Sequence, residues 1–174
     1  MAFFLRMLWR SARGRPPNLV CRPATWKAGV DELRRRAADV RESGAFLLGT
    51  PKGGRTRRIE QFLFYDDVDP NCFAHGFVEF DGRRLGAVWS VCRESGRTVL
   101  ADIHVHPGGC SQSSSDRHNP MIAEAGHVAI ILPYYAAGPH LPPAIGIYEY
   151  LGGRRWRDHS ALGDRILHIG WWPS

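Results

Sequence analysis

The sequence of 174 residues has no uninterrupted apolar run that approaches the roughly 20 residues of a membrane-spanning helix. Arg6 splits the apolar residues near the start, so the pattern of a secretory signal is also missing. Internal repeats and low-complexity segments are absent as well. We expect residues 1–17 to form an N-terminal arm or a first strand. Residues 18–174 are long enough to form one domain with a substantial core.

Cysteine is scarce and is never closely paired. The four cysteines are widely and irregularly spaced, at Cys21, Cys72, Cys92 and Cys110. The absence of a Cys-x-x-Cys pair argues against a disulfide framework and against a structural zinc knuckle. Unpaired cysteines are typical of a reducing compartment, so we expect a cytoplasmic protein.

Lysine is rare, and arginine supplies nearly all of the positive charge behind the net charge of +6. The arginines are spread over residues 34–36, 55–58, 83–84 and 154–157. Aromatic residues do not alternate with them, as they would in a surface that stacks nucleic-acid bases. We therefore interpret the arginines as solvated positions. Nucleic-acid binding is kept as an alternative, and steep salt dependence of that binding would support it.

Two stretches have the apolar spacing of helices. From Trp26 to Val40, apolar residues recur at steps of three and four, which predicts a helix with Thr25 as N-cap and Gly44 beyond its end. Residues 82–95 are predicted to form a second helix. Its apolar face is formed by Leu85, Val88, Trp89 and Cys92.

Short apolar runs bounded by turn residues predict the strands. They cover residues 45–48, 59–65, 98–106, 126–133, 144–151 and 165–171, with a shorter strand at 154–157. The aromatic-rich segment 66–80 is predicted to be a loop that covers part of the molecule. This order predicts an α+β or α/β single domain, with a mixed curved sheet packed by two or three helices.

The segment 101–116, ADIHVHPGGCSQSSSD, concentrates side chains that can bind a metal. His104 and His106 are two residues apart on a strand, so they project to one side with Cα atoms ~6.6 Å apart. The turn that begins at Pro107 allows Asp116 to return to the same ion. Two histidines and one carboxylate leave a fourth position for water in catalytic zinc sites. Non-haem iron uses the same donors, and we expect one Zn²⁺ ion.

Four other residues in or near this segment could bind a metal by their chemistry, but we do not expect them to be ligands. Asp102 faces the same side as the histidines and is a rival ligand, but we expect it to orient an imidazole. We expect Cys110 to be a small buried filler. His118 and His127 are interpreted as ordinary polar or satisfied histidines.

Two further residues complete a hydrolytic site. Glu42, beside the buried strand 45–48, is the candidate general base for a water activated by the metal. Ser113 is the candidate donor to a developing oxyanion, a contact that can contribute ~3 kcal/mol.

These residues together resemble the JAMM motif of the JAB/MPN metalloproteases, over roughly residues 22–150. The motif residues are Glu42, His104-x-His106-Pro107 and Ser113-x-x-Asp116. The resemblance implies a cytidine-deaminase-like fold and a zinc ion held by the two histidines and the aspartate. It also implies that the glutamate is the general base and that the serine stabilises the oxyanion.

One spacing departs from the family pattern. Five residues separate Pro107 from Ser113, where the common pattern has six. Ser114 is therefore an alternative oxyanion donor, although only Ser113 keeps the three-residue step to Asp116.

The run HPGGCSQSSSDRHNPM is similar to bacterial members encoded beside ubiquitin-like activating and conjugating enzymes. This likeness implies a zinc isopeptidase that hydrolyses the amide bond after the C-terminal tail of a ubiquitin-like protein, in deconjugation or precursor processing. We expect the tail to bind as an added strand, with loops 66–80 and 134–143 contacting the modifier. The alternative from another class is a non-catalytic MPN-type interaction module.

Overall fold

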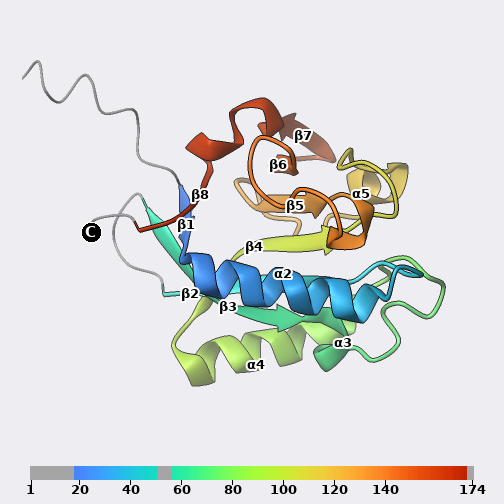
Figure 1. Cartoon of the computed structure of the whole chain (residues 1–174). Helices are drawn as coiled ribbons and strands as arrows, with labels where there is room; N and C mark the ends of the chain where they lie inside the picture. Colours follow the sequence, from blue (N-terminus) through green and yellow to red (C-terminus); the bar gives the residue numbers. More distant parts are fainter. Residues whose placement is uncertain (1–17, 51–55, 172–174) are drawn as a thin grey trace, which may run out of the picture.

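The computed structural model describes residues 18–50 and 56–171, which form one mixed eight-stranded sheet with several helices. Neighbouring strands follow the order β7-β6-β5-β4-β2-β3-β1-β8, and the sheet curls across the molecule (Figure 1). The strands are β1 (Leu19–Cys21), β2 (Gly44–Gly49), β3 (Arg57–Phe64), β4 (Thr98–Val105), β5 (Val128–Leu132), β6 (Gly146–Gly152), β7 (Arg155–Asp158) and β8 (Leu167–Ile169). The predicted single-domain class with a mixed sheet is confirmed. The predicted arm, residues 1–17, lies outside the described residues.

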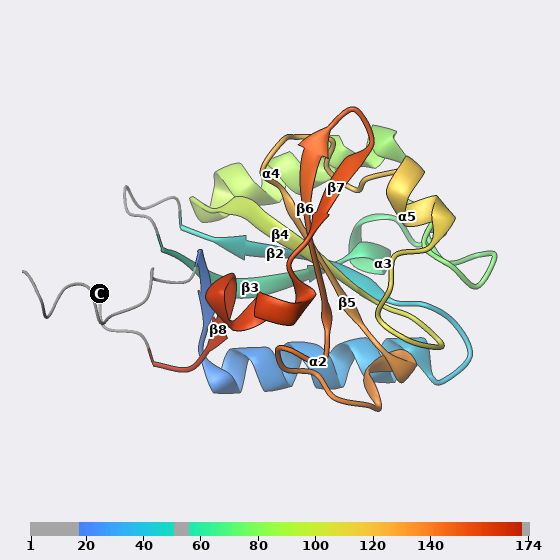
Figure 2. The same cartoon turned by 90° about the horizontal axis from the view of Figure 1, so that it is seen from above.

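Helices pack on both faces of the sheet. The helices are α2 (Pro23–Ala37), α3 (Tyr65–Val68), α4 (Leu85–Ser95) and α5 (Ser114–His118), with short 3₁₀ turns at Gly82–Arg84, Tyr134–Ala136 and Ser160–Arg165. Figure 2 shows α2 and α4 on opposite sides of the strands. Trp26, Val30 and Leu33 of α2 belong to one buried cluster, whereas Val88 and Cys92 of α4 belong to a second. Each face of the sheet is therefore covered by its own hydrophobic core.

Helix α2 begins and ends earlier than predicted. Its N-cap is Arg22 and not Thr25, because Pro23 at the first helical position has φ preset for a helix and needs no hydrogen bond to its nitrogen. The helix ends at Ala37, because Ala38 adopts a left-handed conformation with φ 51°. Val40, predicted on the apolar face, is consequently 75% exposed.

The second predicted helix and one strand also differ in detail. The helix starts as a 3₁₀ turn at Gly82 and becomes α4 at Leu85, and Trp89 on its predicted buried face is 38% exposed. The strand predicted to end at Tyr65 ends at Phe64, because Tyr65 begins α3. Tyr65 is fully buried, and its ring lies against the backbone of Gly44.

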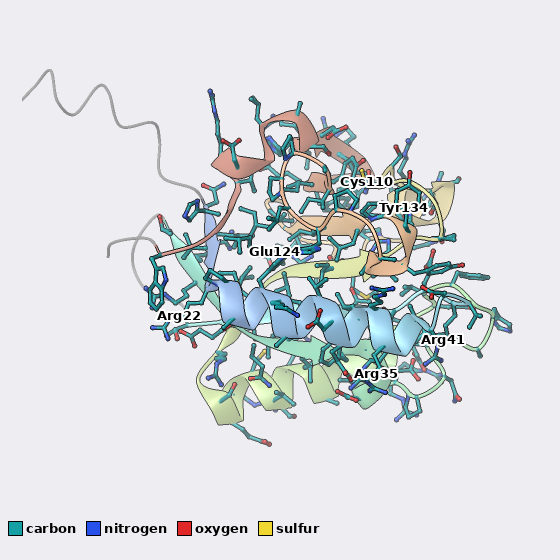
Figure 3. The ribbon with its side chains drawn as sticks, in the orientation of Figure 1. Arg22, Arg35, Arg41, Cys110, Glu124 and Tyr134 are labelled. Atoms are coloured by element: carbon teal, nitrogen blue, oxygen red, sulfur yellow. The ribbon has the colours of Figure 1, made fainter. Side chains whose placement is uncertain are left out.

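The prediction that the arginines are solvated is wrong for Arg36, whose side chain is only 16% exposed. Figure 3 shows Arg35 on α2, with Arg22 before its start and Arg41 beyond its end. Arg36 lies among three acidic side chains, Glu32, Asp66 and Asp67, so part of the positive charge is used to join α2 to α3. Within the described residues, none of the helices has the length and apolar character needed to cross a membrane.

Candidate metal centre

Three predicted ligands come together at the C-terminal end of β4. The Nε2 atoms of His104 and His106 are 3.0 Å apart. Asp116 Oδ1 lies 3.5 Å from His104 Nε2, and its Oδ2 lies 3.3 Å from His106 Nε2. The two histidines are buried, with 7% and 6% exposure. Among the described residues, this is the group of histidine, cysteine and acidic side chains whose ligand atoms are arranged to hold a metal ion.

The spacing of these atoms fits a tetrahedral ion. Two donor atoms at about 2.0–2.1 Å from a tetrahedral zinc ion lie about 3.3–3.4 Å from each other. The two imidazole nitrogens are 3.0 Å apart, close to that value, and with one donor atom from each of the three residues the donors lie within 4.8 Å of one another. Three protein ligands leave one position for water or substrate, as in catalytic zinc sites. The donor set also suits non-haem iron, so the geometry supports a metal site without selecting the metal.

A capping box places Asp116. Ser113 is the N-cap of α5, and its hydroxyl accepts a hydrogen bond from Asp116 N at 3.1 Å. Asp116 Oδ2 in turn accepts from Ser113 N at 2.6 Å. This reciprocal pair requires a three-residue step, which Ser114 cannot provide to Asp116. The same carboxylate therefore both caps the helix and faces the two histidines.

Glu42 lies beside the three ligands and is not one of them. Its Oε1 is 3.8 Å from His106 Nε2, and its Oε2 accepts a hydrogen bond from Val78 N at 2.9 Å. The backbone N–H of Glu42 also donates to Gly76 O. The segment that contains Gly76 and Val78 thus fixes the glutamate and leaves Oε1 directed towards the metal site.

Asp116 and His104 shift each other's pKa. Burial raises the pKa of Asp116, but hydrogen bonds from His104 and His106 outweigh burial and hold that pKa well below its usual range. Burial lowers the pKa of His104, yet the hydrogen bond and charge of Asp116 reverse the effect and raise it overall. Metal ions bind neutral imidazole and ionised carboxylate, so uptake of an ion must release any proton held by the histidines.

Asp102 belongs to a separate buried cluster. Its Oδ1 lies 2.6 Å from His127 Nε2, and its Oδ2 accepts a hydrogen bond from the Tyr65 hydroxyl at 3.2 Å. Burial, reinforced by Asp102, raises the pKa of Tyr65 well above its usual value, so the hydroxyl retains the proton that it donates. Asp102 orients an imidazole as predicted, but that imidazole belongs to His127. The interpretation of His127 as a satisfied histidine is confirmed.

A left-handed turn holds the end of β4. Tyr134, Tyr135 and Ala136 all have positive φ, between 53° and 62°, which is rare for residues other than glycine. Tyr135 N donates to His106 O at 2.8 Å, and Tyr134 N donates to Gly108 O at 2.9 Å. Strained backbone of this kind often occurs at functional sites. Here the turn fixes the backbone directly after the second histidine ligand.

A cavity of about 670 Å³ opens beside the ligands, with His104 and Asp116 in its wall. Its apolar lining comes from two segments, with Phe77, Val78, Phe80, Leu85 and Trp89 from one, and Pro120, Met121 and Ile122 from the other. Trp156 of β7 also lines the cavity, and its Nε1 donates to Arg117 O of α5 at 3.1 Å. The end of the predicted loop 66–80, residues 77–80, therefore lines the cavity, whereas residues 66–68 belong to α3 and not to a loop. The 134–143 loop contributes no residue to the cavity lining and instead contacts α2, where Trp26 Nε1 donates to His140 O.

Cys110 and His118 lie close to the candidate metal centre in sequence, and the structure places each of them near the surface. Cys110 is partly exposed and is not a buried filler, because it lies on the irregular segment between β4 and α5. Figure 3 shows Cys110 and Tyr134 on the same part of the molecule. His118 is an exposed polar residue, as expected, with Nδ1 2.7 Å from Ser114 O. Sequence reasoning missed Gln112 and Ser115, which line the cavity but have no ligand chemistry that would mark them.

No family model matches the sequence. The solution structure of a protein from Desulfitobacterium hafniense is similar to this chain, with a TM-score of 0.62 and 15% sequence identity over 87% of this chain and 92% of that one. A second solution structure, of a protein from Salinibacter ruber, has a TM-score of 0.45 at 18% identity and covers 74% of this chain and 83% of that one. The first similarity bears on the fold alone, and the second is too low to support an argument.

Proposed function

We propose that this chain is a zinc-dependent peptidase of the JAB/MPN type, which hydrolyses the amide bond after the C-terminal tail of a ubiquitin-like protein. The observation that carries the proposal is the arrangement of four side chains. His104, His106 and Asp116 each present a donor atom within 4.8 Å of the other two, and Glu42 Oε1 lies 3.8 Å from His106 Nε2. The resemblance of the run HPGGCSQSSSDRHNPM to bacterial members of the family supplies the substrate class.

Each side chain has a separate task in this proposal. A zinc ion, when bound by the three ligands, supplies a Lewis acid that favours ionisation of water and polarises the substrate carbonyl. Glu42 takes the proton of the attacking water at Oε1, since Oε2 already accepts from Val78 N. As the carbon–nitrogen bond breaks, Glu42 delivers that proton to the leaving amine. The products are a free amine and a carboxylic acid, which releases its proton to solvent at neutral pH.

The cavity supplies the place for the polypeptide on either side of the bond. Its apolar walls bury side chains and exclude water, which strengthens the electrostatic contacts inside it. Of the two edge strands, β7 contributes Trp156 to the lining and β8 contributes no residue. We therefore place the added strand of the substrate tail at β7.

Metal analysis and cleavage test the proposal. The purified protein should contain about one zinc ion per chain and should release a fluorogenic amine from the C-terminus of ubiquitin or of a ubiquitin-like protein. Glu42→Gln should retain zinc and lose at least about 100-fold in kcat, within the usual contribution of a general base. His104→Ala should lose both zinc and turnover.

Two outcomes would reject the function. A wild-type protein that binds no metal contradicts the assignment of the ligands. A protein that binds zinc and the ubiquitin-like protein without cleaving it would be a non-catalytic interaction module.

A further inference from the structure

Helix α5 carries the ligand Asp116 but has no apolar residue with which to pack. Its residues are two serines, an aspartate, an arginine and a histidine, and none of them is buried. A helix this short is not stable by itself in water, because most helical stability in proteins comes from the packing of an apolar face. The position of α5 in the fold therefore depends on polar contacts.

The capping box does not place α5 relative to the histidines. It joins Ser113 to Asp116 within one turn, so it fixes the carboxylate on its own helix. Outside residues 112–119, the described part of the chain makes two kinds of hydrogen-bond or ion-pair contact with α5. One is the approach of the Asp116 carboxylate to the two histidine ligands. The other is a hydrogen bond of 3.1 Å from Trp156 Nε1 to Arg117 O.

The indole bond holds the end of α5 that lies opposite the cap. The last carbonyl groups of a helix have no donor within the helix and need one from elsewhere. Asn119 N bonds to Ser115 O, and the indole of Trp156 supplies the donor for Arg117 O. This bond ties α5 to β7, the strand beside which it lies (Figure 1).

Trp156 is itself held by the sheet. It pairs with Tyr150 of β6 in the register of the two strands, and their ring centroids are 4.9 Å apart. Tyr150 is buried, and its hydroxyl accepts a hydrogen bond from Arg154 N at 3.1 Å. The indole therefore has a packed aromatic ring as its support and the backbone of α5 as its hydrogen-bond partner.

We infer that Trp156 is a positioning residue for the metal centre. Its indole holds the C-terminal end of α5 on β7, which keeps Asp116 within reach of both histidines. The inference rests on the proposed function for the assignment of Asp116 as a metal ligand. It gives the edge strand of the sheet a part in metal binding, through a residue that lies outside the metal-binding motif.

Trp156→Phe separates the hydrogen bond from the ring, because phenylalanine keeps an aromatic contact with Tyr150 and has no N–H group. Zinc affinity, measured by competition with a chromophoric chelator, should fall about 10-fold. This is the low end of the loss that follows removal of a partner that orients a metal ligand. Zinc affinity is the readout of choice because Trp156 also lines the cavity, where a changed side chain affects substrate binding directly.

Trp89→Phe is the matched control. Trp89 lies on α4 and lines the same cavity, whereas the indole bonded to α5 is that of Trp156. Trp89→Phe should bind zinc with the affinity of the wild type. Wild-type zinc affinity in Trp156→Phe, or equal losses of affinity in the two variants, would overturn the inference.

A double-mutant cycle tests whether Trp156 acts through Asp116. Asp116→Ala retains the two histidines and should bind zinc more weakly than the wild type. Adding Trp156→Phe to this variant should leave the remaining zinc affinity unchanged, because the ligand that the indole positions is gone. A further loss as large as in the wild-type background would contradict the inference, since it would show a general loosening of the fold.

The zinc titrations separate this inference from the proposed peptidase function. If the wild type cleaves nothing and the cycle shows that Trp156 and Asp116 are coupled, the peptidase proposal fails and the role of Trp156 stands. If the wild type cleaves its substrate and Trp156→Phe binds zinc with wild-type affinity, the inference about Trp156 fails and the peptidase proposal stands.

Discussion

Ser113 and Asp116 cap each other across the first turn of α5, with bonds of 3.1 Å and 2.6 Å, while the same aspartate faces both histidines. The motif spacing Ser-x-x-Asp is therefore the spacing of a capping box. The cap of α5 and the candidate metal site therefore share one carboxylate.

Ser113→Ala should weaken metal binding although the serine is not a ligand. Loss of the cap removes the bond that holds the first turn of α5, at a cost of about 1 kcal/mol in folding free energy. Zinc affinity should fall about 10- to 100-fold, as is typical when the partner that orients a ligand is lost. A competition titration with a chromophoric chelator measures it. Ser114→Ala is the control and should bind zinc as the wild type does; equal losses in the two variants would contradict the capping argument.

Gly44→Ala should destabilise the protein because Gly44 is in close contact with Tyr65. A Cβ atom at this position would lie 2.3 Å from the Tyr65 ring, and Gly44 pairs directly with His104 across the sheet. Overpacking of this kind costs about 1–3 kcal/mol, measurable by urea denaturation. Gly86→Ala in α4 is the control, because a Cβ there meets nothing within 4 Å. That variant should be about 0.5–1 kcal/mol more stable. Equal stability of both variants and the wild type would refute the packing argument.

Glu32 should contribute to stability only above acidic pH. Hydrogen bonds from Arg35 and Arg36 outweigh a smaller effect of burial and lower the pKa of Glu32 from 4.5 to about 2. The folded-state pKa is depressed, so its stabilising effect is complete above pH 4.5 and is lost as the pH falls towards 2. The difference in melting temperature between wild type and Glu32→Gln should be small, because the pair is near the surface, and should narrow steadily below pH 4.5. If the melting temperatures of wild type and Glu32→Gln differed by the same amount at pH 7 and pH 3, the proposed role of Glu32 ionisation would be wrong.

Thiol labelling should find one reactive cysteine of the four. Burial raises the pKa of Cys21 and Cys72 to about 12 and also raises that of Cys92, which suppresses the reactive thiolate. Cys110 is the cysteine that is not fully buried. A disulfide reagent should therefore label one thiol quickly in the folded protein and four in urea. The fast phase should disappear in Cys110→Ser; its persistence would show that another thiol is accessible.

The sequence predicts a strand well where its apolar residues are the residues that the folded sheet buries. β2 and β5 are continuous apolar runs, and both are buried over their full length. The pairing of His104, His106 and Asp116 was also predictable, because two histidines two residues apart on a strand share a side and a glycine-containing turn brings the chain back. Periodicity along one segment was sufficient in these cases.

Other features depend on contacts between distant segments. β1 has only three residues and is stabilised by pairing with β3 and β8. Its own residues are therefore not sufficient to predict a strand. α5 is five residues long and is held by its capping box and by Trp156 from β7. The burial of Gln112 likewise arises from the cavity walls, and nothing in the neighbouring serines indicates it.

The candidate metal centre and the walls of the cavity beside it come from different parts of the fold. Glu42, the proposed base, precedes β2, and the two histidines lie on and directly after β4; these two strands are adjacent in the middle of the sheet. The cavity walls come mostly from segments 77–89 and 119–124, outside those strands, and Phe77 is 47% exposed. Substitutions in these walls can accumulate without moving the ligands. Under the proposed function, the same metal centre would therefore serve different protein substrates as the cavity walls change.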